Sequence, residues 1–153
     1  MEKDNSTKLI RSGLKRTEFM ETSEPLFLTS GFVYNSAEEA EDAFKERKKR
    51  FMYSRFGNPT VHMLQDKLAD IEGAEVCWCT STGMAAVFTI FMSFLKKGDR
   101  VVAGRALFGS CHHIITEILP RFGIEVELID GKDLNAWEKA LKKKTSLIFF
   151  ETP

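Results

Sequence analysis

The residues from Tyr53 to Thr60 form the segment of the chain with the highest density of functional groups, and they read Tyr-Ser-Arg-Phe-Gly-Asn-Pro-Thr. Arg55 carries a planar fork of N–H donors and Tyr53 carries a phenol. In an extended backbone, side chains two residues apart point to the same side, so this pair could bind one phosphate group. A surface loop that precedes a helix is the alternative, and the pattern leaves both interpretations open.

A second phosphate-binding candidate lies where a predicted strand passes into a helix, at residues 80–86, which read Thr-Ser-Thr-Gly-Met-Ala-Ala. Free backbone N–H groups and the positive end of the helix dipole meet at such a junction, and both favour an anion. An ordinary helix cap has the same composition and stays an alternative. No G-x-G-x-x-G and no Gly-Lys-Ser/Thr follows a predicted strand, which argues against dinucleotides and nucleoside triphosphates.

Two more loops follow predicted strands, and ligands of open α/β sheets bind beyond the carboxyl ends of the strands. In residues 104–110, Phe108 stands between two glycines, where its ring could stack on a flat ligand or pack in the core. In residues 150–153, Glu151 emerges from the last predicted strand, and the sequence assigns it no role.

Metal chemistry has weak support in the sequence. Cys77 and Cys79 alternate onto one face of a predicted strand, whereas Cys111, His112 and His113 are consecutive on a predicted helix. Neighbours on a helix diverge by ~100° and cannot ligate one ion together. We therefore expect no metal site, and the odd number of cysteines, 3, argues against a disulfide framework.

The pattern of apolar residues predicts an α/β protein with a largely parallel sheet. Residues 1–35 are predicted as an extended or irregular arm, a capping box at Ser36 and Glu39 opens a helix to about Lys49, and a second helix runs from Asn58 to Gly73. Beyond it, strands alternate with helices, and connections that contain a helix require parallel strands. The predicted strands lie near residues 76–80, 100–103, 125–129 and 146–150, and the predicted helices near residues 83–95, 110–122 and 133–143.

Composition narrows the class of protein. The 153 residues contain 22 Lys+Arg and 22 Asp+Glu, a formal net charge of +0, so no basic surface for nucleic acid is expected. The longest nearly apolar stretch, from Met84 to Leu95, is well short of the ~20 residues that span a membrane. Because the first residues lack an apolar signal segment, we expect a cytoplasmic protein.

Four linked motifs, in this order and spacing, resemble the pyridoxal-phosphate-dependent family of Cys/Met metabolism enzymes: residues 53–60, 68–75, 81–86 and 98–103. The family includes cystathionine gamma-synthase, cystathionine and methionine lyases and homoserine-ester sulfhydrylases. The resemblance implies a type I aminotransferase-like fold, of which this chain is the front part. Residues 1–57 are then an N-terminal arm and inter-subunit segment, and residues 58–153 a partial pyridoxal-phosphate-binding domain.

The resemblance also implies roles for the candidate residues. The backbone amides of Gly83 and Met84 are expected to bind the phosphate of pyridoxal 5'-phosphate. Phe108 is expected to stack on its pyridine ring, at a place where the lyases and cystathionine synthase usually carry Tyr. Tyr53 and Arg55 are expected to reach the phosphate of the neighbouring subunit. The implied assembly is a homodimer that builds a homotetramer.

The resemblance also points to one activity within the family. Residues 11–14, 28–34 and 105–111 look most like O-succinylhomoserine sulfhydrylases, which replace succinate by sulfide on a homoserine ester and so make homocysteine for methionine biosynthesis. Another family member, or a non-catalytic phosphate-binding α/β module, is the alternative. The Schiff-base lysine is expected beyond Pro153, so no catalytic residue is assigned and the chain alone is expected to be inactive.

Overall fold

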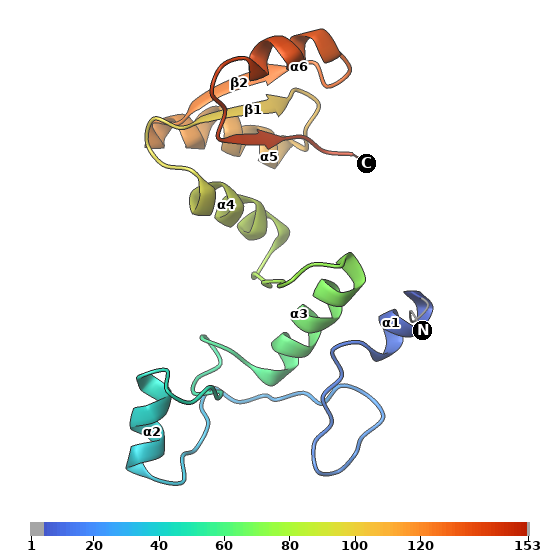
Figure 1. Cartoon of the computed structure of the whole chain (residues 1–153), viewed down its shortest axis with the longest axis vertical. Coiled ribbons are helices and arrows are strands. Elements are labelled where there is room, and N and C mark those ends of the chain that lie inside the picture. The colour runs from blue at the N-terminus through green and yellow to red at the C-terminus, as the bar shows by residue number, and fades with distance from the viewer. Residues whose placement is uncertain (1–4, 153) are drawn as a thin grey trace. The chain divides into compact units, whose positions relative to one another are not determined.

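The computed structural model describes residues 5–152, and the chain divides into two compact units, Met1–Cys79 and Thr80–Pro153 (Figure 1). The described part of the first unit contains the helices α1 (Asn5–Arg11), α2 (Ala37–Phe44) and α3 (Pro59–Glu72). The described part of the second unit contains, in order, α4 (Gly83–Phe94), β1 (Arg100–Gly104), α5 (Gly109–His113), the π-helical turn η1 (Ile114–Ile118), the 3-10 turn η2 (Leu119–Phe122), β2 (Glu125–Ile129), α6 (Leu134–Leu141) and β3 (Leu147–Phe149). The assignment of residues 1–57 to an arm and inter-subunit segment, and of residues 58–153 to a partial cofactor-binding domain, stays a prediction.

The second unit contains the parallel sheet that the alternation of strands and helices predicted. The strand order is β2-β1-β3, and both pairs are parallel. Val101 of β1 is in register with Val126 of β2 on one side and with Leu147 of β3 on the other. The central strand β1 is buried along its whole length, as expected for a strand that is paired on both edges and covered on both faces.

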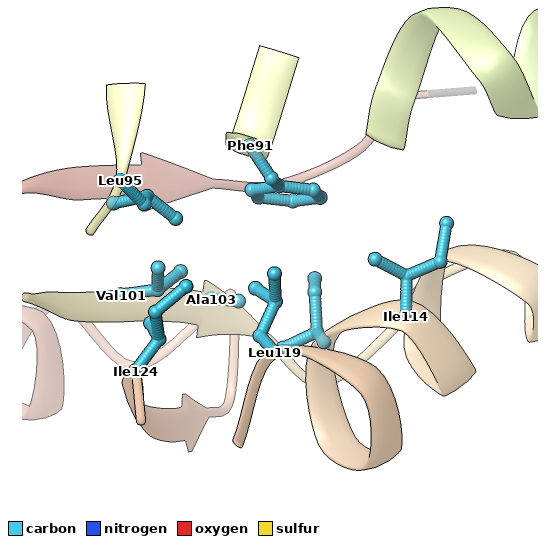
Figure 2. Packing of buried hydrophobic residues seen from close by; sticks show 8 residues of the cluster. Phe91, Leu95, Val101, Ala103, Ile114, Leu119 and Ile124 are labelled. Atoms are coloured by element: carbon cyan, nitrogen blue, oxygen red, sulfur yellow. The ribbon is translucent and has the colours of Figure 1, made fainter. Parts of the chain in front are cut away.

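Helices cover the two faces of this sheet in the second unit. Val101 and Ala103 point to one face, where Phe91 of α4, the C-cap residue Leu95 and Ile114 at the start of η1 pack against them (Figure 2). Val102 points to the opposite face, where it packs with Ile129 of β2 and Ala140 of α6. The alternation of side chains along β1 therefore divides the apolar residues into two layers.

Arg100 fixes the amino end of β1, away from the carboxyl ends of the strands. Its side chain is buried, donates to the carbonyl of Ala140 (3.0 Å) and to Thr145 Oγ1 (2.6 Å), and forms an ion pair with Glu127. The guanidinium thus ties β1 to β2 and to the chain after α6. A buried charge needs such partners, because an unpaired one costs several kcal/mol.

In the first unit, helix α2 begins with one half of the predicted capping box, because the Glu39 side chain contacts the residue before the N-cap instead of the N-cap Ser36 itself. Ser36 Oγ accepts the backbone N–H of Glu39 (3.1 Å), and the Glu39 carboxylate accepts the backbone N–H of Asn35 (2.8 Å). The carboxylate also contacts the Nζ of Lys48 (3.0 Å) and the guanidinium of Arg50 (2.9 Å). Glu39 therefore joins the start of α2 to the segment that leads toward Tyr53.

These contacts predict how the stability of the first unit depends on pH. The N–H of Asn35, followed by Lys48 and Arg50, lowers the pKa of Glu39 from 4.5 to about 2. A lowered carboxyl pKa stabilises the fold above the unfolded value, and this contribution is lost as the pH falls from about 4.5 toward 2. We expect Glu39→Gln to lower the melting temperature at pH 6, and the difference from wild type to shrink over that interval.

The control for this prediction is Glu72→Gln, a change of the same kind on the exposed end of α3. It should leave the melting temperature close to that of wild type at every pH. A difference between wild type and Glu39→Gln that stays constant from pH 6 to pH 2 would contradict the role given to the Glu39 carboxylate.

Three local predictions were wrong. Residues 76–80 form no strand, and in the described chain no other strand pairs with them, so their backbone groups have no ladder to join. Helix α2 ends at Phe44 instead of near Lys49, because Glu46 adopts a left-handed backbone conformation (φ 57°) that a helix cannot include. Residues 5–11, predicted to be irregular, form helix α1.

Within residues 5–152, no helix has the length and the apolar composition that crossing a membrane requires.

Candidate functional site

The first turn of α4 presents the amide pair that the sequence singled out. Thr82 is the N-cap, and it accepts the N–H of Ala85 at its hydroxyl (3.0 Å) and the N–H of Ala86 at its carbonyl (3.1 Å). In the part of the chain that the structure describes, the N–H groups of Gly83 and Met84 have no acceptor. A helix start leaves such donors free for water, side chains or a ligand.

The space and the charge around this turn fit a phosphate group. A side chain at Gly83 would meet nothing within 4 Å, so an anion has room to approach the backbone. Helix α4 contributes the positive end of its dipole, and no acidic residue lies in its first turn. The donor set, two neighbouring amides at a helix start, is the one that phosphates bind.

Phe108 lies in the loop between β1 and α5, within the same unit. Phe108 is 64% exposed in this chain, so it does not pack in the core of the second unit and its ring is accessible to a flat ligand. Helix α4 leads into β1 through residues 95–99 and packs along the sheet (Figure 1). The first turn of α4 therefore lies toward the carboxyl end of β1, where the loop that contains Phe108 begins. The stacking role of the ring stays a prediction.

Glu151 has a contact partner that the sequence did not predict. Its carboxylate accepts the backbone N–H of Phe108 at 2.7 Å. Burial of Cys111, followed by its hydrogen bond to Glu151 and the nearby charge, raises the pKa of that thiol from 9.0 to about 11. Cys111 is therefore a protonated core thiol at neutral pH, as expected. A carboxylate just past the end of a strand was the only signal for this contact in the sequence.

Tyr53 and Arg55 lie together in the first unit. Tyr53 pairs with Gly31 in an isolated antiparallel bridge, but the chain turns directly after it, because the N–H groups of Phe56 and Gly57 donate to the carbonyl of Tyr53 (2.9 and 3.2 Å). The extended backbone expected from Tyr53 to Arg55 is therefore wrong. The guanidinium of Arg55 lies 5.1 Å from the centre of the Tyr53 ring and 5.3 Å from that of Phe56. Within residues 5–152, Arg55 forms no ion pair with a carboxylate, so its fork of donors is available to an external anion.

Asn58 holds this segment in place. Its side chain is 8% exposed, and its amide nitrogen donates to the carbonyl of Phe27 (2.9 Å) and to Ser54 Oγ (3.0 Å). Its amide oxygen accepts the N–H of Thr60 (2.9 Å) and so caps helix α3. One buried amide therefore connects the arm, the Tyr53–Arg55 segment and α3.

We expect the two halves of the Asn58 amide to be separable by mutation. Asn58→Asp keeps the oxygen that caps α3 but loses both N–H donors, whereas Asn58→Ala loses the cap as well. Each broken buried hydrogen bond costs about 1–3 kcal/mol, so both variants should be destabilised, the alanine variant more. Hydrogen exchange should show deprotection around residues 27 and 54 in both variants and around residue 60 only in the alanine variant. Equal deprotection of all three regions by Asn58→Asp would contradict this assignment.

In the described part of the chain, no group of three or more His, Cys, Asp or Glu side chains has the arrangement of a metal site. The predicted strand that would carry Cys77 and Cys79 on one face does not form, but the two thiols interact, since the pKa of the Cys79 thiol is raised first by burial and then by Cys77. The site candidates thus fall into two groups. Tyr53 and Arg55 belong to the first unit, and Gly83, Met84 and Phe108 to the second.

Comparison with known proteins gives consistent results. Residues 6–153 match the family described as Cys/Met metabolism PLP-dependent enzyme. An O-succinylhomoserine sulfhydrylase from Mycobacterium tuberculosis is 49% identical over 144 residues, which cover 94% of this chain and 36% of the relative. An L-methionine gamma-lyase from Treponema denticola is 34% identical over 148 residues, which cover 97% of this chain and 37% of the relative.

Among solved structures, a putative O-acetylhomoserine (thiol)-lyase from Campylobacter jejuni superposes with a TM-score of 0.87 at 27% identity. The match covers 97% of this chain and 36% of that chain, which carries N'-pyridoxyl-lysine-5'-monophosphate. The chain therefore spans little more than a third of the length of the relatives that it matches.

Proposed function

Since the chain belongs to the family of Cys/Met metabolism PLP-dependent enzymes, we propose that it is the amino-terminal part of an O-succinylhomoserine sulfhydrylase. The enzyme exchanges the succinate of O-succinylhomoserine for sulfide and releases homocysteine and succinate. The observation that carries this choice is the 49% identity to a curated enzyme of that activity, against 34% to a methionine gamma-lyase over a similar stretch.

The residues of this chain bind and orient the pyridoxal phosphate. The N–H groups of Gly83 and Met84 donate to the phosphate, and the α4 dipole adds to the attraction. The exposed ring of Phe108 packs against the pyridine face. When bound, the cofactor supplies an electron sink for carbanions formed next to the amino group of the substrate. The protein contributes orientation and electrostatics.

Tyr53 and Arg55 complete the site of the neighbouring subunit. The absence of a carboxylate partner for Arg55 in the described chain supports this role, because the guanidinium is left to bind an anion. The protein is accordingly a homodimer in which each site draws on both subunits, and two dimers form a homotetramer in the cytoplasm.

Phe108 supports the choice of sulfhydrylase over lyase. A phenyl ring stacks on the pyridine but cannot donate or accept a proton, whereas the tyrosine usual in the lyases can do both. A site with Phe108 therefore lacks one group that moves protons during elimination.

The test is a product assay on the full-length enzyme. Four reactions are compared: O-succinylhomoserine with sulfide, O-acetylhomoserine with sulfide, O-succinylhomoserine with cysteine, and methionine alone. We expect the first to have the highest kcat/KM, with homocysteine as product. Faster use of the acetyl ester, a preference for cysteine with cystathionine as product, or faster release of methanethiol from methionine would each reject the proposal in favour of another family member.

We further propose that the 153-residue chain is inactive on its own, because none of its lysines is assigned to hold the cofactor. Incubation with pyridoxal phosphate, reduction with borohydride and mass spectrometry should give scattered labelling well below one equivalent. Stoichiometric labelling of a single lysine would contradict this.

A further inference from the structure

Glu151 bridges the ends of two neighbouring strands of the sheet. It lies two residues beyond β3, and its carboxylate reaches the loop that follows β1, where it accepts the N–H of Phe108 at 2.7 Å. The same carboxylate lies near Cys111, which is buried in the first turn of α5, and helps to raise the pKa of that thiol. Glu151 therefore holds the backbone directly before α5 through the N–H of Phe108.

The position of the Phe108 ring depends on this attachment. In the part of the chain that the structure describes, no other aromatic ring contacts the Phe108 ring, which is 64% exposed. Packing therefore does little to fix its side chain, and the ring follows the backbone at residue 108. That backbone is held by a charge-assisted hydrogen bond, a short and strong type of contact.

We propose that Glu151 is a positioning residue for the cofactor ring. By holding the backbone N–H of Phe108, it keeps the phenyl ring where the pyridine of pyridoxal phosphate can stack on it. The inference rests on the proposed function, in which Phe108 is the stacking ring, and it extends that function to a residue 43 positions away along the chain.

The competing explanation is that Glu151 only stabilises the start of α5. A carboxylate near the first turn of a helix is favourable with or without a ligand. The two explanations differ in one respect. A residue that acts through Phe108 changes cofactor binding only while the Phe108 ring is present, whereas a residue that stabilises the helix changes the melting temperature regardless of the ring.

The experiment is a double-mutant cycle in the full-length enzyme with Glu151→Ala, Phe108→Ala and the double variant. The readouts are the Kd of pyridoxal phosphate, from absorbance titration of the apoenzyme, and the visible circular dichroism of the bound cofactor. We expect Glu151→Ala to raise Kd about threefold or more and to change the dichroism, and to add nothing in the Phe108→Ala background. Glu151→Gln should restore most of the affinity, because its carbonyl oxygen can still accept the N–H of Phe108.

Three results overturn the inference. They are an unchanged Kd in Glu151→Ala, an equal rise in Kd with and without the Phe108 ring, and a fall in melting temperature alone. If Glu151→Ala does not fold, Glu151→Asp takes its place in the cycle, because it keeps the charge but withdraws it by one methylene.

Failure of the proposed function has a different signature. Wild-type apoenzyme that does not bind pyridoxal phosphate would reject the proposed function itself. Normal wild-type binding with no effect of Phe108→Ala would reject the stacking role, and with it the positioning role of Glu151.

Discussion

Arg55→Ala weakens the binding of pyridoxal phosphate to the full-length enzyme by about 10- to 150-fold. This range corresponds to the about 1.5–3 kcal/mol of a hydrogen bond to a charged group. The effect is large because the guanidinium, which has no carboxylate partner in the described chain, is proposed to neutralise the phosphate. The Kd from absorbance titration measures it. The control is Arg47→Ala, an exposed arginine paired with Asp42, which should leave Kd unchanged.

Mixed dimers show in which subunit Arg55 acts. An Arg55→Ala subunit is combined with a subunit that lacks the cofactor-binding lysine, so that each homodimer is impaired. If Arg55 serves the opposite site, one site of the mixed dimer has both an intact lysine and an intact Arg55, and activity returns. If Arg55 serves its own site, no site is complete and the mixture stays inactive, which would contradict the shared site.

Substitutions of Phe108 separate stacking from proton transfer. Phe108→Tyr keeps the flat ring, so we expect the full-length enzyme to retain its cofactor. The added phenol stands where the lyases usually carry one, and we expect more elimination, seen as release of an α-keto acid from the homoserine ester at the expense of homocysteine. Phe108→Ala removes the ring and should raise the Kd of the cofactor about tenfold, since aromatic pairs contribute ~0.5–1.5 kcal/mol beyond the area they bury.

The matched control is Phe122→Tyr, which adds the same hydroxyl to a half-exposed ring in the 3-10 turn η2. It should leave the ratio of α-keto acid to homocysteine unchanged. An unchanged product ratio in Phe108→Tyr, together with normal cofactor content in Phe108→Ala, would falsify both roles given to the ring.

The parts of the fold that the sequence predicted correctly are those with local signals. Asn58 and Gly73 mark the two ends of α3, because a side-chain cap and a left-handed glycine satisfy the free backbone groups there. The parallel sheet followed from connections that contain helices. The strand predicted at residues 76–80 failed because a strand needs a paired neighbour, and an alternating pattern alone does not supply one.

The candidate site divides in the same way. Gly83 opens helix α4 and Phe108 lies between β1 and α5, so local sequence position alone was enough to single them out as candidates. The contact between Glu151 and Phe108 spans 43 positions and depends on the pairing of β1 with β3, and the contact between Asn58 and Phe27 spans 31. No local pattern specifies such long-range hydrogen bonds, so only the folded chain shows which side chains hold the functional ones.

A crystal structure of the full-length enzyme with bound pyridoxal phosphate tests the central claim most directly. We predict phosphate oxygens at hydrogen-bond distance, about 2.7–3.2 Å, from the backbone nitrogens of Gly83 and Met84 in one subunit, with Tyr53 and Arg55 of the partner subunit on the same phosphate. A phosphate bound away from the first turn of α4, or one whose protein contacts all come from a single subunit, would contradict the account.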